Sequence, residues 1–168
     1  MKITSNNNEK IFQKDVLLVT KTDLKGNITY ANRNFMQIVG MREDQLIGKP
    51  HNIIRHPQMP QIIFKYLWTY LQRGDEIHAY VKNLCPDNSY YWVMANITPS
   101  FDVQEPTKII GYLSSRRSPS KEAISSIVPL YEKLLQAEKN GGMNASEKIM
   151  NNILKEKGVS YAEFILSI

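Results

Sequence analysis

Residues 49–60 read Lys-Pro-His-Asn-Ile-Ile-Arg-His-Pro-Gln-Met-Pro. This stretch holds two of the three histidines and three of the eight prolines of the chain. Because proline fixes φ and disfavours a helical conformation in the residue before it, no long helix can pass through the stretch. Apolar Ile53, Ile54 and Met59 are interleaved with polar side chains. The pattern therefore predicts a half-buried loop of fixed shape.

This loop has two possible roles, and the residues alone leave both open. Its polar side chains are either satisfied inside the core or form the wall of a binding site. In the second case Arg55 and the histidines would donate hydrogen bonds to an anionic or carbonyl-rich ligand, because guanidinium and imidazole groups are suited to such acceptors.

Strands and short helices are expected before the loop. The β-branched run at residues 16–22 and the run at 28–30 predict a hairpin, with Gly26 supplying positive φ in the turn. Helical spacing of apolar residues then predicts one short helix that ends at Gly40 and another that ends at Gly48.

A longer helix and three strands are expected after the loop. The helix begins at Pro60 and ends at Gly74, and the strands cover residues 77–84, 90–99 and 108–115. Two strands, several helices and three strands favour an α+β fold. We expect a five-stranded antiparallel sheet with short helices and the 49–60 loop on one face.

The two ends of the chain are expected to be separate from this domain, which covers residues 15–118. Residues 1–14 are polar and Asn-rich, which predicts a flexible or facultatively helical cap. Residues 119–168 predict helices broken at Gly141-Gly142. Their apolar residues exceed what one small sheet face needs, so we expect them to contact a second chain. This stripe consists of Ile124, Ile127, Tyr131, Leu134, Ile149, Ile153 and Phe164.

Composition narrows the classes of function. The chain has 168 residues, is 42% hydrophobic and carries a net charge of +5. The basic residues are scattered, which does not favour nucleic-acid binding. No run approaches the ~20 apolar residues of a membrane helix, and no signal peptide begins the chain, so we expect a cytoplasmic protein. A single cysteine, Cys85, excludes an internal disulfide framework and a CxxC metal site.

Three strings, at residues 22–32, 46–57 and 91–99, resemble a PAS domain. They are similar to the aerotaxis-receptor type, which holds FAD non-covalently and signals redox state to the chemotaxis machinery. The resemblance extends over about residues 15–134 and implies the PAS fold. Proteins of that type continue into a membrane anchor and a signalling coiled coil, and this chain reaches Ile168 with neither. The resemblance therefore implies a bipartite system, in which a soluble PAS protein, expected as a homodimer, is recruited to the inner face of the membrane by a separate membrane-bound transducer.

The resemblance also implies a set of cofactor-binding residues. Arg55 and His56 match positions important for flavin retention, and Asn32 and Trp68 match as well. Asn83 and Asn96 lie on adjacent strands, from which amides can face a flavin ring. The sequence leaves open whether His51 contacts the ligand or has a structural role. The implied set is Asn32, His51, Arg55, His56, Gln58, Trp68, Asn83 and Asn96.

Two positions depart from the family pattern. Gln58 stands where the family has an acid, and Ile77 where it has a tryptophan. Losing a charged acceptor and a stacking wall predicts weaker flavin retention, a larger pocket or a different occupant.

Alternative chemistries are less favoured. Haem would need one axial histidine, and nothing in the sequence places a loop histidine toward an apolar cavity. Photosensing PAS domains carry an Asn-Cys-Arg motif on a helix, whereas Cys85 lies in a hairpin turn, where we expect a surface thiol. No catalytic constellation can be assembled, so an enzyme is not expected. The main alternative is a cofactor-free PAS adaptor that mediates protein–protein signalling, and a flavin- or haem-dependent enzyme is the third.

Overall fold

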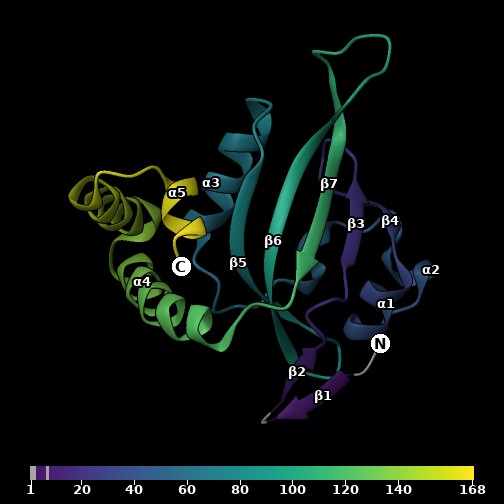
Figure 1. Ribbon diagram of the computed structural model, residues 1–168, viewed down its shortest axis with the longest axis horizontal. Helices are drawn as coiled ribbons and strands as arrows, with labels where there is room; N and C mark the ends of the chain where they lie inside the picture. Colours follow the sequence, from purple (N-terminus) through teal and green to yellow (C-terminus); the bar gives the residue numbers. More distant parts are fainter. Residues whose placement is uncertain (1–2, 7) are drawn as a thin grey trace.

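The computed structural model describes the backbone of residues 3–6 and the chain from residue 8 to residue 168. Its centre is a seven-stranded sheet (Figure 1) in the order β1-β2-β6-β7-β3-β4, with β5 also paired to β6. The strands are β1 (Ile3–Asn6), β2 (Glu9–Phe12), β3 (Leu18–Thr22), β4 (Ile28–Ala31), β5 (Ile77–Leu84), β6 (Tyr90–Phe101) and β7 (Ile109–Arg117).

The five predicted strands are β3 to β7, and every pairing among them is antiparallel, which confirms the predicted α+β fold. The prediction of a flexible or helical cap is wrong for most of residues 1–14. Strands β1 and β2 form an antiparallel hairpin there, and β2 joins β6 through a parallel pairing of Glu9 with Tyr90. Residues 1, 2 and 7 of that cap lie outside the described part of the chain.

Four short helices cover one face of the sheet. They are α1 (Arg33–Val39), α2 (Glu43–Leu46), the 3-10 helix η1 (His51–Ile54) and α3 (Gln61–Gln72). The side chain of Asn32 caps α1, and Gly40, with a φ of 76°, ends it. The sequence predicted Pro60 at the start of α3, and the structure places it one residue earlier, as an extended N-cap with a ψ of 136°.

The 49–60 loop is attached to the sheet on both sides. The amide of Ile28 donates to the Lys49 carbonyl at 2.8 Å, and the amide of His51 donates to the Gly26 carbonyl at 2.9 Å. At its other end Arg55 pairs with Asn83 of β5 in an isolated antiparallel bridge. The predicted position of this loop against the sheet is confirmed.

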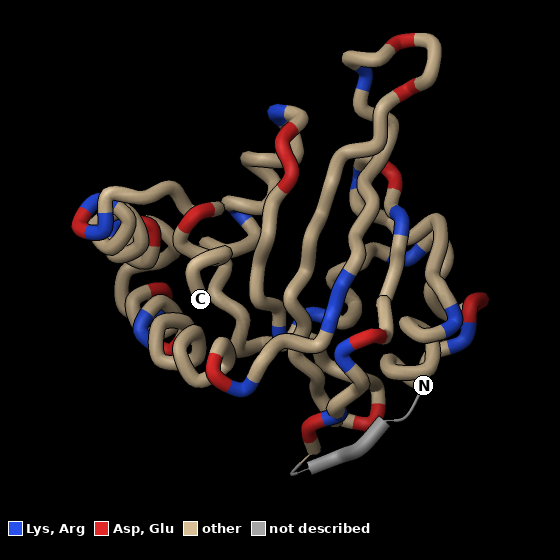
Figure 2. The backbone as a smooth tube through the Cα atoms, viewed as in Figure 1, with Lys and Arg blue, Asp and Glu red and all other residues tan. Residues whose placement is uncertain are grey.

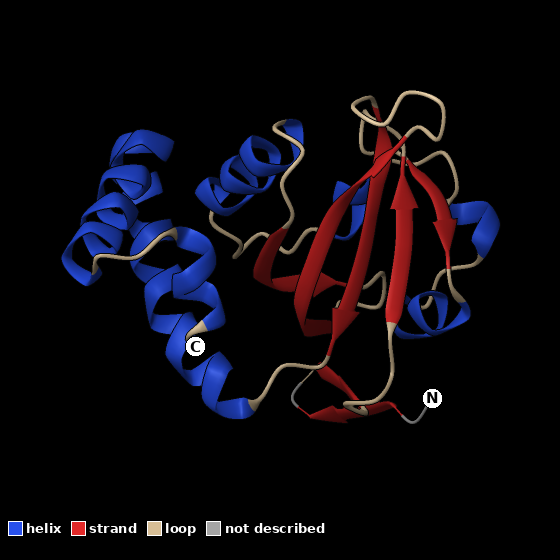
Figure 3. Cartoon of the chain, turned by 45° about the horizontal axis from the view of Figure 1, so that its top comes forward, coloured by secondary structure: helices blue, strands red, loops and turns tan. Residues whose placement is uncertain are grey.

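The C-terminal helices lie on the β5 side of the molecule (Figures 1 and 3). They are α4 (Lys121–Lys157), with non-helical backbone at Gly141 and Gly142, and α5 (Tyr161–Leu166). The Tyr131 hydroxyl donates to the Tyr80 carbonyl of β5 at 2.7 Å, and its ring lies 6.1 Å from that of Trp92.

This packing corrects the prediction that the apolar stripe faces a second chain. Ile127, Tyr131, Leu134 and Phe164 are buried within the chain itself. The other three stripe residues are half-buried and pack against the same core. Side chains of the sheet's second face, such as Tyr80 and Trp92, supply the partner surface that the sequence did not reveal.

Charges are mixed over the described chain. Lys and Arg positions alternate with Asp and Glu positions along the helices and loops (Figure 2), so the net positive charge forms no stripe. None of the helices in the described residues is long and apolar enough to cross a membrane.

Candidate ligand-binding site

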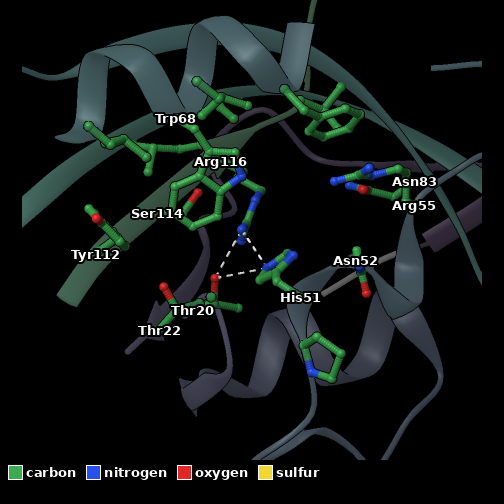
Figure 4. A pocket seen from close by; sticks show the side chains of 18 of the residues that line it. Thr20, Thr22, His51, Asn52, Arg55, Trp68, Asn83, Tyr112, Ser114 and Arg116 are labelled. Carbon is green, nitrogen blue, oxygen red and sulfur yellow. Dashed lines mark hydrogen bonds between the residues drawn. The ribbon is translucent and has the colours of Figure 1, made fainter. Parts of the chain in front are cut away.

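A cavity of about 340 Å³ lies between the sheet, the 49–60 loop and α3 (Figure 4). This volume is within the range of small-molecule and cofactor sites. The cavity is lined by Thr20, Thr22, Lys25, Gly26, Pro50, His51, Asn52, Arg55, Phe64, Leu67, Trp68, Leu71, Val81, Asn83, Ala95, Ile97, Tyr112, Ser114 and Arg116.

One side of the cavity holds a hydrogen-bonded group of three side chains. Nη2 of Arg116 donates to Thr20 Oγ1 at 2.9 Å and to His51 Nε2 at 2.8 Å. Figure 4 shows Arg116 from β7 and His51 from the loop pointing toward one another. Burial, and then the neighbouring Arg116, lower the pKa of His51 to about 3, so the ring is neutral and accepts the guanidinium's hydrogen bond.

Arg116 is a buried cation, with 5% of its surface exposed. Burial lowers its pKa to about 10, which still leaves it charged at neutral pH. No carboxylate forms an ion pair with it in the described part of the chain. A buried charge is costly unless it is paired, so this position favours an anionic or strongly polarised partner.

Three polar groups that line the cavity are buried and have no hydrogen-bond partner among the described residues. They are Nη1 of Arg116, Nδ2 of Asn83 and Oγ of Ser114. An unmade hydrogen bond of a buried group costs about 1–3 kcal/mol. The cavity therefore offers several unused donors to a ligand rich in acceptors.

The remaining walls are apolar and aromatic. Phe64, Leu67, Trp68 and Leu71 lie on one face of α3 because they follow the i, i+3, i+4, i+7 spacing of a helix. The Trp68 ring meets the Tyr112 ring edge to face, with 5.5 Å between centroids. Apolar walls with a few polar groups at one side are typical of small-molecule and cofactor sites.

An open groove of about 500 Å³ adjoins the cavity and shares Arg55, Phe64 and Trp68 with it. The Arg55 guanidinium lies 3.6 Å from the centre of the Phe64 ring. Lys65 lines the groove from α3, and Met143 of α4 lines it from the C-terminal segment. The groove thus places two cationic side chains beside an aromatic wall.

Four of the eight residues implied by the family resemblance line the cavity: His51, Arg55, Trp68 and Asn83. Figure 4 shows Arg55 and Asn83 side by side. Their grouping follows from the bridge between the loop and β5.

The other four do not line it. Asn32 is occupied at the start of α1, where Oδ1 accepts from the amides of Val19 and Phe35 at 3.0 Å each. His56 lines the adjoining groove, and its Nδ1 accepts from the Gln58 amide at 3.1 Å. Burial, and then Lys82, lower the His56 pKa to about 4.

Gln58 and Asn96 point elsewhere. Oε1 of Gln58 accepts from Lys82 Nζ at 2.7 Å on the surface. Asn96 pairs with Glu76 and His78. It follows Ala95, which lines the cavity, so strand alternation turns Asn96 to the opposite face of the sheet.

The sequence interpretation missed Arg116 and Ser114. Arg116 is buried, although Arg117 beside it is exposed. The signal was present in the alternation of β7, because Tyr112, Ser114 and Arg116 share one face. Cys85 was also misjudged: its thiol is buried near the Ile38 carbonyl, away from the cavity, and burial raises its pKa.

The sheet, antiparallel except where β2 pairs with β6, encloses a cavity against short helices. The family model described as the PAS fold matches residues 28–113, which is just over half of the chain. The chain belongs to the PAS family, as the sequence strings predicted.

Similarity to known proteins supports the aerotaxis-receptor type of PAS domain. The aerotaxis receptor of Escherichia coli (strain K12) is 38% identical over 144 residues, which cover 86% of this chain and 27% of the receptor. The biofilm dispersion protein BdlA of Pseudomonas aeruginosa is 32% identical over 94 residues, or 55% of this chain and 22% of that protein. The chain thus spans about a quarter of the length of these relatives.

The fold is also found in solved structures. A light-oxygen-voltage domain solved in a study of a flavin analogue has a TM-score of 0.60 and 18% identity, covering 69% of this chain and 87% of that chain. The predicted resemblance to aerotaxis-receptor PAS domains is therefore confirmed at the level of family and fold.

Proposed function

We propose that this PAS domain binds FAD in the cavity and acts as a cytoplasmic redox sensor. The observation that carries the proposal is the set of unpaired buried donors on Arg116, Asn83 and Ser114. One edge of an isoalloxazine ring presents carbonyl oxygens and ring nitrogens, which are acceptors for such donors. The apolar part of the ring would lie against Trp68 and Phe64.

The adjoining groove supports a dinucleotide over a mononucleotide. Its Arg55 side chain could contact a diphosphate that leaves the cavity past Phe64, because a guanidinium group binds phosphate oxygens. Met59 and Met143 add apolar surface for the adenine end.

Haem is not the ligand we propose. Nε2 of His51, the atom an iron would need, already lies 2.8 Å from Arg116 Nη2 and 3.2 Å from Thr20 Oγ1. The pairing favours a role for His51 in shaping the cavity over axial ligation.

A bound flavin would supply reversible electron uptake, and the residues around it would respond to the change in charge. Arg116 stays a donor whatever the ligand's state, whereas Asn83 can turn its amide and His51 can exchange partners. A lost pairing of a buried group costs about 1–3 kcal/mol, which is enough to bias a two-state arrangement several-fold.

Signalling is proposed to pass to a membrane-bound chemotaxis transducer, with this protein acting as a homodimer. The similarity to a protein named aerotaxis receptor, over 86% of this chain, supports that kind of partner. A cofactor-free adaptor is the alternative.

Reconstitution with FAD tests the proposal. We expect the wild-type protein to retain yellow FAD through gel filtration and to bind FAD more tightly than FMN. Arg55→Ala should weaken FAD binding by about tenfold or more, since a charge-assisted contact is lost. Asn96→Ala, on the opposite face of the same sheet, is the matched control and should bind as the wild type does. A wild type that takes up no FAD would favour the adaptor.

A further inference from the structure

Helix α3 makes contacts on two opposite faces. The inner face supplies the apolar wall of the cavity through Phe64, Leu67, Trp68 and Leu71. The outer face contacts the C-terminal helices. Any shift of α3 therefore changes both the cavity wall and those contacts, because the helix moves as one body.

The first turn of α3 is held by a side chain from α4. Pro60 precedes the helix and has no side-chain hydrogen-bonding group to cap it. Instead the Glu138 carboxylate accepts from the amides of Gln61 at 2.9 Å and Ile62 at 3.0 Å. Ser146 Oγ in turn donates to Glu138 at 2.9 Å. A carboxylate there satisfies two free amides and suits the positive end of the helix dipole.

The outer face of α3 is held by the second part of α4 and by α5. Lys65 pairs with Glu147 at 2.6 Å, and the Tyr66 hydroxyl donates to Asn151 at 3.0 Å. The Tyr66 ring stacks on Tyr161 of α5 with 4.8 Å between centroids. We call Ser146, Glu147, Asn151 and Tyr161, all of which lie beyond Gly142, the clamp.

The clamp is joined to the rest of α4 by a natural hinge. Gly141 and Gly142 have non-helical backbone, and Gly142 has a φ of 69° that glycine adopts readily. The first part of α4 is anchored on the sheet through Ile127 and Tyr131, both buried. Beyond the hinge, the polar contacts to the outer face of α3 are partly exposed to solvent, and buried Met150 and Tyr161 add apolar packing. The two parts of α4 are therefore attached through separate contacts, and the hinge allows the second part to shift while the first part stays in place.

We propose that filling the cavity strengthens the attachment of the clamp to α3, so that residues 143–157 report the state of the cavity. This inference rests on the proposed function for the identity of the ligand. A ring packed against Phe64, Leu67 and Trp68 supports α3 from the inside and keeps its outer face in register with the clamp. When the cavity is empty, release of the second part of α4 from α3 would present that part to a partner.

Hydrogen exchange on the full chain tests the coupling. Saturating FAD should slow amide exchange in residues 143–157 by about five-fold or more, the usual size of a coupling between sites. Glu138→Ala should raise exchange there and weaken FAD binding by a similar factor, since coupling is reciprocal. Glu132→Ala, at an exposed position of the first part of α4, is the matched control and should do neither. If FAD binds and exchange in residues 143–157 is unchanged, the clamp proposal fails and the proposed function stands.

A ligand-free arm decides the clamp if FAD does not bind. Leu67→Ala removes support from the inner face of α3, and Val39→Ala makes a comparable deletion in the core under α1. We expect Leu67→Ala to raise exchange in residues 143–157 more than in β6, which reports global opening. Val39→Ala should raise amide exchange in residues 143–157 and in β6 by similar factors. Equal effects of the two variants on residues 143–157, relative to β6, would overturn the clamp whatever the outcome with FAD.

Discussion

His51 and Arg116 form the polar centre of the cavity, and only one of them is charged. The neutral state of His51 follows from its burial beside the guanidinium, which lowers its pKa to about 3. A protonated His51 would face Arg116 at the 2.8 Å that now separates the two nitrogens. The arrangement therefore depends on pH.

The pH dependence of stability should carry a contribution from His51. Its folded pKa of about 3 lies below the ordinary 6.5, so the unfolded chain binds more protons between these values. The stabilisation is complete above pH 6.5 and is lost as the pH falls toward 3. Between pH 7.5 and 5.0 this amounts to about 2 kcal/mol.

Chemical denaturation at those two pH values measures the effect. From the higher to the lower pH, the free energy of unfolding of the wild type should fall by about 2 kcal/mol more than that of His51→Gln. The free energy of unfolding of His78→Gln, which keeps His51, should fall by as much as that of the wild type. Equal slopes for the wild type and His51→Gln would contradict the neutral, buried His51.

Asn32 should matter for folding and not for a ligand. Its side chain bridges the start of α1 to Leu17, just before β3, and to Val19 within β3. We expect Asn32→Ala to lower the free energy of unfolding by about 1–2 kcal/mol, the cost of a lost cap. FAD affinity, measured by fluorescence quenching under folding conditions, should stay within two-fold or so of wild type. A selective loss of FAD binding with stability intact would make Asn32 a cofactor contact after all.

At the scale of elements, β3 and β7 approach closely where the cavity opens. A Cβ built on Gly111 would lie 2.4 Å from the Thr22 carbonyl oxygen, which is backbone and cannot turn aside. Gly111→Ala should therefore destabilise the protein by about 1–3 kcal/mol, as overpacking does. Ile110→Ala, at an exposed neighbouring position, is the control and should have a small effect. Thermal unfolding of the two variants checks this, and equal midpoints would refute the close approach.

One buried hydroxyl adds a hydrogen bond to the apolar packing of α4 on the sheet. Tyr131 donates to the Tyr80 carbonyl at 2.7 Å, and its ring is 2% exposed. Tyr131→Phe keeps the ring and removes the donor, so we expect a loss of about 1 kcal/mol. Denaturant midpoints give the measurement. An unchanged midpoint would mean that ring packing alone holds α4.

Local patterns predicted most of these elements. The alternation in residues 77–84 and 90–99, and the helical spacing from Phe64 to Leu71, each follow from short-range periodicity. The hairpin of β1 and β2 was missed because its residues are polar and its pairing to Tyr90 is remote in sequence. Asn96 was misplaced because a shift of one residue in a strand reverses the face.

At the scale of the whole molecule, the sequence could not reveal which surfaces meet. Ile127 and Tyr131 form an apolar stripe whose partner is the second face of the sheet, and nothing local marks that face as available. Glu138 likewise caps a helix far away in the sequence. Arg116 acquires its meaning only when β7, β3 and the loop are brought together around one cavity.

The central claim is that the cavity uses Arg116 to hold an acceptor-rich cofactor, and Arg116→Met tests it most directly. Removing an unpaired buried charge should leave the ligand-free protein as stable as wild type or more so. The same change should weaken FAD binding by about tenfold or more, since a charge-assisted hydrogen bond is lost. FAD titration followed by absorption, with unfolding of both ligand-free proteins as the reference, is the measurement. We predict that the wild type binds one FAD per chain. The variant should be equally folded and should bind FAD more weakly. Equal FAD affinity in the two proteins, or no FAD uptake by wild type, would contradict the account.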